Sequence, residues 1–394
     1  MNGITKMRNK SLRSQRGMVL MTSLMILAVL LAVGIGAGVM LRNDFQVLAN
    51  LRGSTEAFYF SAAGVEWGKR EIAQATTFPP TPANQSKSFS SGQFAVAFLS
   101  STAVGPLAAQ IVVQSTGTAR GADHVLQAQL TKSYDLADAA VVLRGNAAGV
   151  NLTGNTIFVS GADHDPTTGN PIAGPKARSA VSSADDTVAG LIFQALGNPP
   201  RLGILESGPD TPVIATSTYL PAAFITQLAD ELCASASATV HSVPSSGGVI
   251  VDNQNWGNQT SPQLHCVDGL LASGDAVTLT GTVSGVGILV VKNADLIIAG
   301  TFRWDGLIIV TGTDISFKTA GPSSKDLLGA VLVNEAGIPG SGRAALDIEG
   351  TVRLLFSRQA LSLTVPLIPT ATINSAHGSL PTTISQNYWR AVTP

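Results

Sequence analysis

The stretch RSQRGMVLMTSLMILAVLL, residues 13–31, puts basic residues directly before a glycine and begins an apolar run at the next position. No charged residue occurs from Met18 to Leu41. As a helix this run is about 36 Å long, enough to cross a hydrocarbon core of about 30 Å. The basic residues ahead of it predict that residues 1–16 stay in the cytoplasm and that the chain after Leu41 is exported.

The alternative interpretation of this stretch is a secretory signal that is removed after export. Gly34, Gly36 and Gly38 supply the small residues that a cleavage site needs. The apolar run resumes after them, however, and continues into an amphipathic pattern. We therefore predict one helix over 18–77, with a transmembrane segment at 18–41. The apolar positions that continue the pattern are Phe45, Leu48, Ala49, Phe58, Ala62, Val65 and Ile72.

Composition favours a folded, β-rich exported part. Charged residues make up 12% of the 394 residues and there are 40 glycines, whereas a disordered chain combines high charge with few apolar residues. The length allows more than one hydrophobic core. The formal net charge of -1 gives no electrostatic footprint for nucleic acid, so no nucleic-acid partner is expected.

Two stretches resemble a known family. Arg16-Gly17-Met18, with its basic leader and apolar helix, resembles a type IV prepilin signal. Residues 56–66, EAFYFSAAGVE, are similar to the end of the N-terminal region of PilX-like minor pilins. The resemblance implies that prepilin peptidase removes the leader 1–17 by cutting after Gly17, and that Met18 becomes the N-methylated N-terminus of a type IV pilus subunit.

The resemblance also carries a departure, at Thr22. Major pilins have Glu at this fifth mature position, where the carboxylate is thought to pair with the N-terminal amine of a neighbouring subunit. Threonine brings no charge to this place. The resemblance then implies an assembly or priming role near the pilus tip, in contact with other pilins and minor pilins and with the inner-membrane assembly platform. The alternative is that Thr22 simply packs in a membrane helix.

The exported part predicts an α+β protein. Proline residues at 79, 80 and 82 end the helix, and residues 78–135 then alternate as strands of a small antiparallel sheet that packs on the second half of the helix. Beyond it we expect a β-rich head over 136–160 and 273–360, and a C-terminal tail over 361–394 that is loop with a late strand. The single membrane pass predicts a periplasmic head that later reaches the pilus or cell surface, where it serves adhesion.

A repeat defines the head. LTGT at 279–282 and IAGT at 298–301 lie 19 residues apart, and GILVV at 287–291 and GLIIV at 306–310 keep the same offset. A further copy, GAVLV at 329–333, follows 23 residues later. Units that recur near 20 residues and cannot bury an apolar face alone are typical of a β-solenoid. A plain antiparallel sandwich is the alternative.

Residues 161–272 interrupt the repeat and are predicted to be an insertion with loops and one helix. Ser217 or Thr218 caps this helix and Pro221 lies in its first turn. The two cysteines, Cys233 and Cys266, both fall in this segment, and in an oxidising compartment they can pair as a disulfide worth roughly 3–4 kcal/mol. Two separate buried thiols are the alternative.

Candidate sites for chemistry are few. Asp163, Asp165 and Thr167 place oxygen ligands in a loop where Ca²⁺ is one interpretation and an Asx turn the other. No other cofactor is expected. The repeat brings acids to rung-like positions, with Asp295 and Asp314 spaced for stacking, but the chain has no nucleophile elbow. We therefore predict no enzyme activity.

The sequence thus favours a non-catalytic minor pilin and leaves two alternatives. One is a K-type pseudopilin of a type II secretion system, a family that also often lacks the Glu at the fifth mature position and that has a large, mostly helical inserted domain. The other is a membrane-tethered β-solenoid that binds or cleaves surface polysaccharide.

Overall fold

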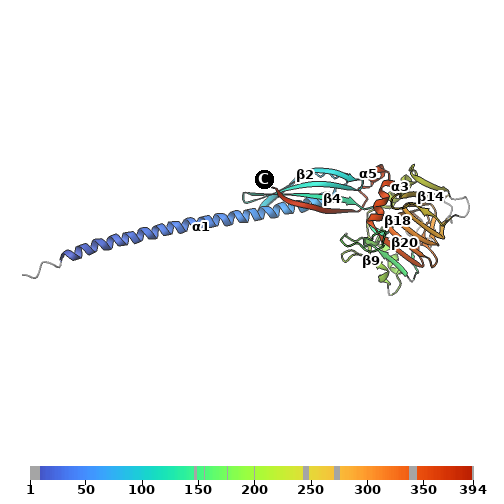
Figure 1. Ribbon diagram of the computed structural model, residues 1–394, viewed down its shortest axis with the longest axis horizontal. Helices are drawn as coiled ribbons and strands as arrows, with labels where there is room; N and C mark the ends of the chain where they lie inside the picture. The colour runs from blue at the N-terminus through green and yellow to red at the C-terminus, as the bar shows by residue number, and fades with distance from the viewer. Residues whose placement is uncertain are drawn as a thin grey trace, which may run out of the picture.

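The computed structural model describes residues 9–145, 149–154, 156–174, 176–198, 200–242, 248–269, 276–336 and 344–392. Its long first helix extends away from a small sheet, and a large β-rich head follows the sheet at the other side (Figure 1). The predicted α+β class is confirmed. The predicted domain divisions differ from the structure in the head and in the C-terminal tail.

Helix α1 runs from Asn9 to Gln74, three residues short of the predicted end at 77. Buried Lys132, from the sheet, holds its last turn. The Lys132 Nζ donates hydrogen bonds to the carbonyl oxygens of Ile72 at 2.9 Å, Ala73 at 3.3 Å and Ala75 at 2.7 Å. The ammonium therefore satisfies carbonyl groups that a helix end leaves without intrahelical partners.

The predicted small sheet has five antiparallel strands in the order β1-β2-β3-β4-β23. Strands β3 and β4 alternate between buried and half-buried residues, which is the pattern of a sheet with one face covered. The second half of α1 covers that face, with Val65 and Ile72 in the shared core. The strands are β1 (Gln85–Phe89), β2 (Gly92–Gly105), β3 (Ala108–Ala119), β4 (Ala122–Tyr134) and β23 (Thr382–Val392).

Small residues let α1 approach this sheet closely. A Cβ on Gly117 of β3 would lie 2.1 Å from the carbonyl oxygen of Ala57, and a Cβ on Gly64 would lie 2.0 Å from the Ser115 Oγ. Ala57 and Ser61, in the same stretch of the helix, have no solvent-exposed surface. The glycine and alanine pattern of residues 56–66 is therefore a packing requirement of the helix on the sheet.

The head is inserted between two neighbouring strands of the small sheet. Strand β4 ends at Tyr134, and Tyr134 pairs directly with Thr382, the first residue of β23. The late strand predicted in the tail over 361–394 is therefore present, but the part before it, predicted as loop, is partly helical. The tail holds α4 (Arg358–Thr364), a short 3-10 turn at Val365–Leu367 and α5 (Thr370–Ala376), and then returns to the small sheet as β23.

Two parallel sheets build the head, so the solenoid interpretation is correct and the sandwich is excluded. The 12-stranded sheet contains the long strands β16, β18 and β20, and the 6-stranded sheet has the order β12-β15-β17-β19-β21-β6. The 19-residue offset appears as register, because Thr282 pairs with Thr301 and Gly287 with Gly306. The strands from the second cysteine onward are β14 (Gln263–Asp268), β15 (Ala276–Thr280), β16 (Thr282–Lys292), β17 (Asp295–Ile298), β18 (Thr301–Gly312), β19 (Phe317–Thr319), β20 (Ser324–Glu335), β21 (Leu346–Ile348) and β22 (Thr351–Phe356).

A column of glycines divides the long strands. Gly287, Gly306 and Gly329 are neighbours in register and have φ of 134°, 144° and 139°. Residues other than glycine rarely adopt this backbone conformation. A Cβ on Gly306 would also lie 2.1 Å from the Gly287 carbonyl oxygen. The glycine that begins each copy of the repeat is therefore the corner residue of a rung.

The coil is continuous in space but not along the chain. Strand β22 pairs with the first part of β20, and β5 pairs with the second part. After Phe356 the chain leaves the coil for α4, and β5 takes the place that the next strand would fill. The chain therefore enters and leaves the solenoid beside one rung, which is why both connections reach the small sheet.

The segment predicted as an insertion, 161–272, forms rungs of the same coil. Strands β8 and β10 extend the sheet beyond β5, and β11, β12 and β13 form its opposite end. These strands are two to six residues long and were too short to show the repeat. They are β8 (Ser179–Ser183), β9 (Leu205–Glu206), β10 (Ile214–Thr216), β11 (Ala238–Ser242), β12 (Val249–Asp252) and β13 (Asn255–Trp256), together with β14. Before this segment lie β5 (Ala139–Gly145), β6 (Val150–Leu152) and β7 (Thr156–Ser160), within the predicted head.

Besides α4 and α5, the described part of the head contains two further helices, with a 3-10 turn at Leu202–Ile204 before β9. Helix α2 (Asp186–Ala195) covers the end of the coil at β6, β8 and β10. Helix α3 (Ala222–Cys233) lies across β14, β16, β18 and β20 and carries the chain to the opposite end. Phe224, Leu228 and Leu232 form the buried face of α3. The predicted cap at Ser217 or Thr218 is wrong, because the N-cap is Pro221 and no side chain in the described part of the chain caps the helix.

Candidate assembly surface

The first half of α1 is an exposed apolar rod. Within the described part of the chain one helix, Met18–Gln74, is long and apolar enough to span a membrane, and its most apolar window has a mean hydropathy of 2.7 with no residue buried. Every large apolar side chain from Met18 to Leu51 is exposed. A helix that is apolar all round and has no partner in its own chain requires lipid or other helices around it.

The predicted processing site lies inside this rod. Gly17 is a residue of α1, and Met18 is exposed. The Thr22 Oγ1 donates to the carbonyl oxygens of Met18 and Val19, both at 3.0 Å. Its hydroxyl is thus satisfied by its own helix, and Thr22 places neither charge nor an unsatisfied polar group on the surface of the rod.

The apolar surface continues beyond the segment that lipid can cover. Leu41, Phe45 and Leu48 are 56%, 63% and 63% exposed and follow the helical spacing of one face. Leu41 and Phe45, together with Gly38 and Ala49, line a shallow hollow on the side of the helix. Because Arg42 and Asp44 mark the water side of the span, this part of the face stays exposed to water unless another protein covers it.

A charged cluster ends the apolar face where α1 meets the sheet. Glu56 accepts from the Arg120 Nε at 2.7 Å and from the Arg52 Nε at 2.9 Å. These hydrogen bonds, first that of Arg120 and then that of Arg52, hold the pKa of Glu56 below its usual value. The cluster ties the β3–β4 turn to the helix at the point where the helix leaves the sheet.

The predicted calcium loop lies against the solenoid, and its carboxylates already have protein partners. Asp163 is buried, accepts from the backbone N–H of Arg358 at 2.8 Å and faces the Arg358 guanidinium at 3.6 Å. The Asp165 Oδ1 accepts from the backbone N–H groups of Thr167 and Thr168 at 2.7 and 2.9 Å, which also lowers the pKa of Asp165. This geometry is the Asx turn of the alternative interpretation.

The described residues contain no group of three or more His, Cys, Asp or Glu side chains arranged to hold a metal ion. The predicted stacking of two rung acids is wrong. Leu296 pairs with Phe317, so Asp295 lies beside Ser316, whose backbone N–H it accepts at 2.9 Å, and not beside Asp314. The register shifts because the connection before β19 is two residues longer than the 19-residue repeat requires.

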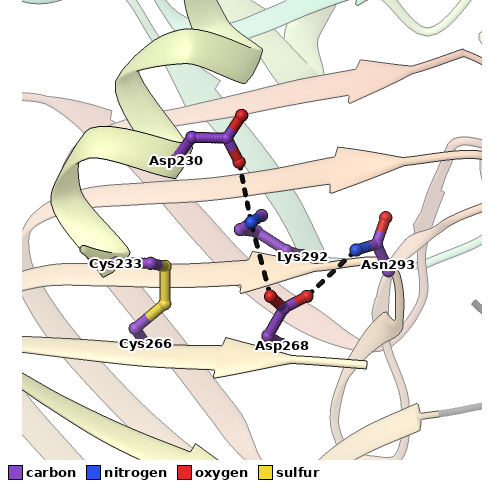
Figure 2. Close-up of a disulfide and its surroundings, with 6 residues drawn as sticks. All are labelled: Asp230, Cys233, Cys266, Asp268, Lys292 and Asn293. Carbon is purple, nitrogen blue, oxygen red and sulfur yellow. Dashed lines mark hydrogen bonds and ion pairs between the residues drawn. A yellow bond between two sulfur atoms is a disulfide. The ribbon is translucent and has the colours of Figure 1, made fainter. Parts of the chain in front are cut away.

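Cys233 and Cys266 form a disulfide that joins the end of α3 to β14, with their Cα atoms 5.5 Å apart (Figure 2). An ion-pair network lies beside it. The Lys292 Nζ contacts Asp230 at 2.7 Å and Asp268 at 3.4 Å, and Asn293 donates to Asp268 at 2.9 Å. The covalent bond and the ion pairs hold the helix that connects the two ends of the coil.

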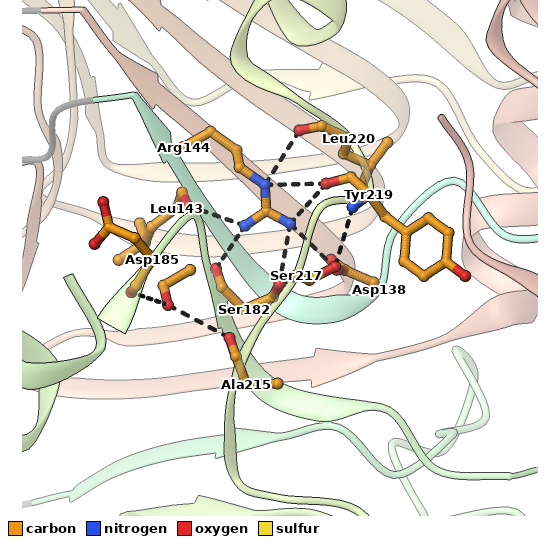
Figure 3. Close-up of polar contacts among 10 residues, drawn as sticks. Asp138, Leu143, Arg144, Ser182, Asp185, Ala215, Ser217, Tyr219 and Leu220 are labelled. Carbon is orange, nitrogen blue, oxygen red and sulfur yellow. Dashed lines mark hydrogen bonds and ion pairs between the residues drawn. The ribbon is translucent and has the colours of Figure 1, made fainter. Parts of the chain in front are cut away.

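Two clusters were not predicted from the sequence. Figure 3 shows the first, in which the buried Arg144 guanidinium donates to the carbonyl oxygens of Tyr219 and Leu220 and contacts Asp138 at 3.2 Å. In the second, His241 Nε2 and His265 Nδ1 are hydrogen-bonded at 3.0 Å, and the Trp256 ring stacks on the His265 ring. Both depend on register between strands distant along the chain, and no local motif marks either of them.

No protein-family model matches the sequence. No curated protein matches it either. Among solved structures, the chain is similar to the competence-associated pilin ComZ from Thermus thermophilus, with 11% sequence identity and a TM-score of 0.22 over 86% of this chain and 98% of that chain.

Proposed function

We propose that this chain is a type IV pilin-class subunit that acts in pilus assembly or priming and has no catalytic role. One observation carries the proposal: a single helix has one half packed on an antiparallel sheet and the other half apolar and exposed all round. Such a rod is held by lipid before assembly and by neighbouring pilin helices afterwards. The Arg16-Gly17-Met18 leader supports the same proposal.

We further propose a minor pilin of the PilX-like kind, sited at the tip. Its partners are other pilins and minor pilins, prepilin peptidase and the inner-membrane assembly platform. Two features support this placement. Thr22 cannot form the charge pair that a carboxylate forms at the fifth mature position, and the head between Tyr134 and Thr382 is much larger than the sheet that carries it. A bulky head fits the end of a filament more easily than its shaft.

The head and membrane placements follow from the same proposal. The subunit begins as a single-pass inner-membrane protein with a periplasmic head and ends on the pilus surface, where the solenoid serves adhesion. The K-type pseudopilin is less favoured, because the resemblance implies a mostly helical insert for that family and this head is a parallel β coil. The third candidate is a membrane-tethered solenoid that binds or cleaves surface polysaccharide. Its mature chain would begin at an uncut Met1, whereas a processed pilin would begin at Met18.

N-terminal sequencing of the mature protein tests this proposal. We expect the chain to begin at an N-methylated Met18. Gly17→Ala should be processed poorly and Gly17→Arg not at all, because the resemblance places glycine before the cut and each added side chain departs further from it. Ser14→Arg is the matched control, since it adds a charge to the leader three residues away and should be processed normally.

An intact Met1 on the mature protein would indicate a simple membrane tether, and a cut near Gly38 would indicate a secreted protein. Either result overturns the pilin proposal, as does normal processing of Gly17→Arg.

A further inference from the structure

The two ends of the solenoid differ in how they are closed. At the end formed by β6, β8 and β10, helix α2 packs over the coil and buries Val188 and Ile192. At the opposite end, no element in the described part of the chain pairs with the outer edges of β11 or β12. Their side chains are open to solvent there, with Val240 57% and Ile250 75% exposed.

The open edge also lacks the usual protection against pairing. Natural edge strands carry lysines, prolines or bulges that discourage another strand from adding to the sheet. Strand β11 reads ATVHS and β12 reads VIVD, and neither has a lysine, a proline or an irregular register with its inner neighbour. The single charge on these two strands is Asp252, at the end of β12.

We propose that the open end of the head pairs with the same end of a second copy of this chain, through antiparallel pairing of β12 with itself about Ile250. A two-fold axis through Ile250 places Val249 of one copy opposite Val251 of the other. Both valines are half-buried and continue the inner face of the coil, since they lie in register with buried Val277 and Leu279. The pairing therefore extends the apolar interior from one head into the next.

Charge is compatible with this arrangement. The two Asp252 side chains would lie about 14 Å apart and each would face Gly248, so that no like charges are opposed. Isologous two-fold contacts are the commonest form of self-association. In Figure 1, β20, β18 and β14 follow one another across the direction of α1, so the open end faces to one side of the long axis of the molecule.

The contact is small. Strand β12 has 4 residues, and the area that its edge can bury is well below the roughly 800 Å² per partner of a standard stable interface. We therefore expect a weak association, which becomes significant where heads are concentrated on a membrane or between filament tips. This inference concerns the head alone and stands whether or not the chain is a pilin.

A cysteine at the proposed axis tests the pairing. In the full-length chain in detergent, Ile250→Cys should form a disulfide with its own copy on mild oxidation, because opposed Cα atoms of an antiparallel pair lie about 4.5–5.5 Å apart, within disulfide range. We expect at least a tenfold higher yield of covalent dimer than from two controls. Thr278→Cys lies in register on the next strand but about 14 Å from its copy, and Phe193→Cys is exposed on α2 at the closed end.

A second variant separates head pairing from association through α1. Ile250→Lys opposes two like charges at the axis. It should abolish the cross-linking between heads that a Val249→Cys/Val251→Cys variant shows, because the axis places Val249 of one copy opposite Val251 of the other. The Cys233–Cys266 disulfide should stay intact by mass spectrometry. The proposal would be overturned by equal dimer yields from Ile250→Cys and its two controls, Thr278→Cys and Phe193→Cys. It would also be overturned if Ile250→Cys gave no dimer.

Discussion

The corner glycines show how one residue sets the shape of the head. Gly306 combines a φ of 144° with a carbonyl oxygen 2.1 Å from the position of a Cβ. We predict that Gly306→Ala lowers the free energy of unfolding by about 2–4 kcal/mol, because it adds both backbone strain and a clash with the next rung. Chemical denaturation monitored by circular dichroism measures the change.

Gly190→Ala is the matched control for this substitution. Gly190 lies in α2, and a Cβ there would have no atom within 4 Å. Since alanine is a better helix former, we expect a gain of about 0.5–1 kcal/mol. If both variants lost the same stability, the corner would not be the cause.

The histidine pair at the open end makes stability depend on pH. Burial, and then the charge of His241, lower the pKa of His265 to about 4 from an ordinary value near 6.5. The unfolded chain therefore binds more protons than the folded chain between these values. The contribution of neutral His265 to the free energy of unfolding is fully present above pH 6.5. As the pH falls toward 4 this contribution is lost, and the free energy of unfolding decreases by roughly 3 kcal/mol at most.

We predict that His265→Phe, which keeps a ring to stack on Trp256, flattens this part of the stability profile. Denaturation at several pH values between 7 and 4 measures the difference between the variant and the wild type. Histidines outside this pair contribute equally to both proteins, whereas His241 loses its hydrogen-bond partner in the variant. Parallel profiles for the two would contradict the assignment to His265.

Sequence reasoning at the residue scale succeeded where the signal is local. The offset that aligns Gly287 with Gly306, and the pair Cys233 and Cys266, were both visible in the sequence, and the structure brings each pair together. Arg144 was not identified, because its partners Tyr219 and Leu220 approach it only after α3 has folded across the coil. An arginine in a strand gives no sign of such a role.

At the scale of elements, the disulfide stabilises the open end of the coil, which no described element covers. Cys233 ends α3, and β11 begins at Ala238, so the bond to β14 fixes the start of the terminal strand. We predict that replacing both cysteines with serine costs about 3–4 kcal/mol. It should also speed amide hydrogen exchange in β11 much more than in β18 at the centre of the coil. Uniform acceleration along all strands would contradict this local role.

The sequence described long elements better than short ones. Strands β16, β18 and β20 have 11, 12 and 12 residues and carry the repeat plainly. Strands β9 and β13 have 2 residues each, too few for a periodic pattern, so the segment around them was interpreted as an insertion. The predicted helix was correct, because an amphipathic face of 12 residues gives a clear signal.

At the scale of the whole molecule, the sequence predicted an anchor, a sheet and a coil but not how they connect. The last strand, β23, pairs with β4, which precedes it by the entire head. No pattern within β23 names its partner, since Tyr388 and Trp389 suit any half-exposed strand. The contact between the head and the small sheet is made by groups distant in sequence. The Phe78 and His377 rings stack with their centroids 4.0 Å apart, and His377 Nε2 is hydrogen-bonded to the Pro106 carbonyl oxygen at 3.1 Å.

This connection predicts that the head can be removed without unfolding the rest. Tyr134 and Thr382 are paired directly, so replacing residues 135–381 with Asn-Gly joins β4 to β23 by a two-residue hairpin turn. We expect the shortened chain to insert in the membrane and to keep its helix and five-stranded sheet, measured by circular dichroism and protease resistance in detergent. It loses only the contacts with the head, whereas the core of Val65, Ile72, Ile111 and Leu130 is entirely its own.

A chain that ends at Tyr134 is the matched control for this experiment. It lacks the head as well, but it also lacks β23, and it leaves the outer edge of β4 unpaired. Because β23 pairs with β4 along nearly its whole length, the truncated chain should be protease-sensitive while the hairpin-joined chain resists. If the two behaved alike, and both were degraded, the sheet would depend on the head for its stability, and the head would be an integral part of the fold and not an insertion carried by it.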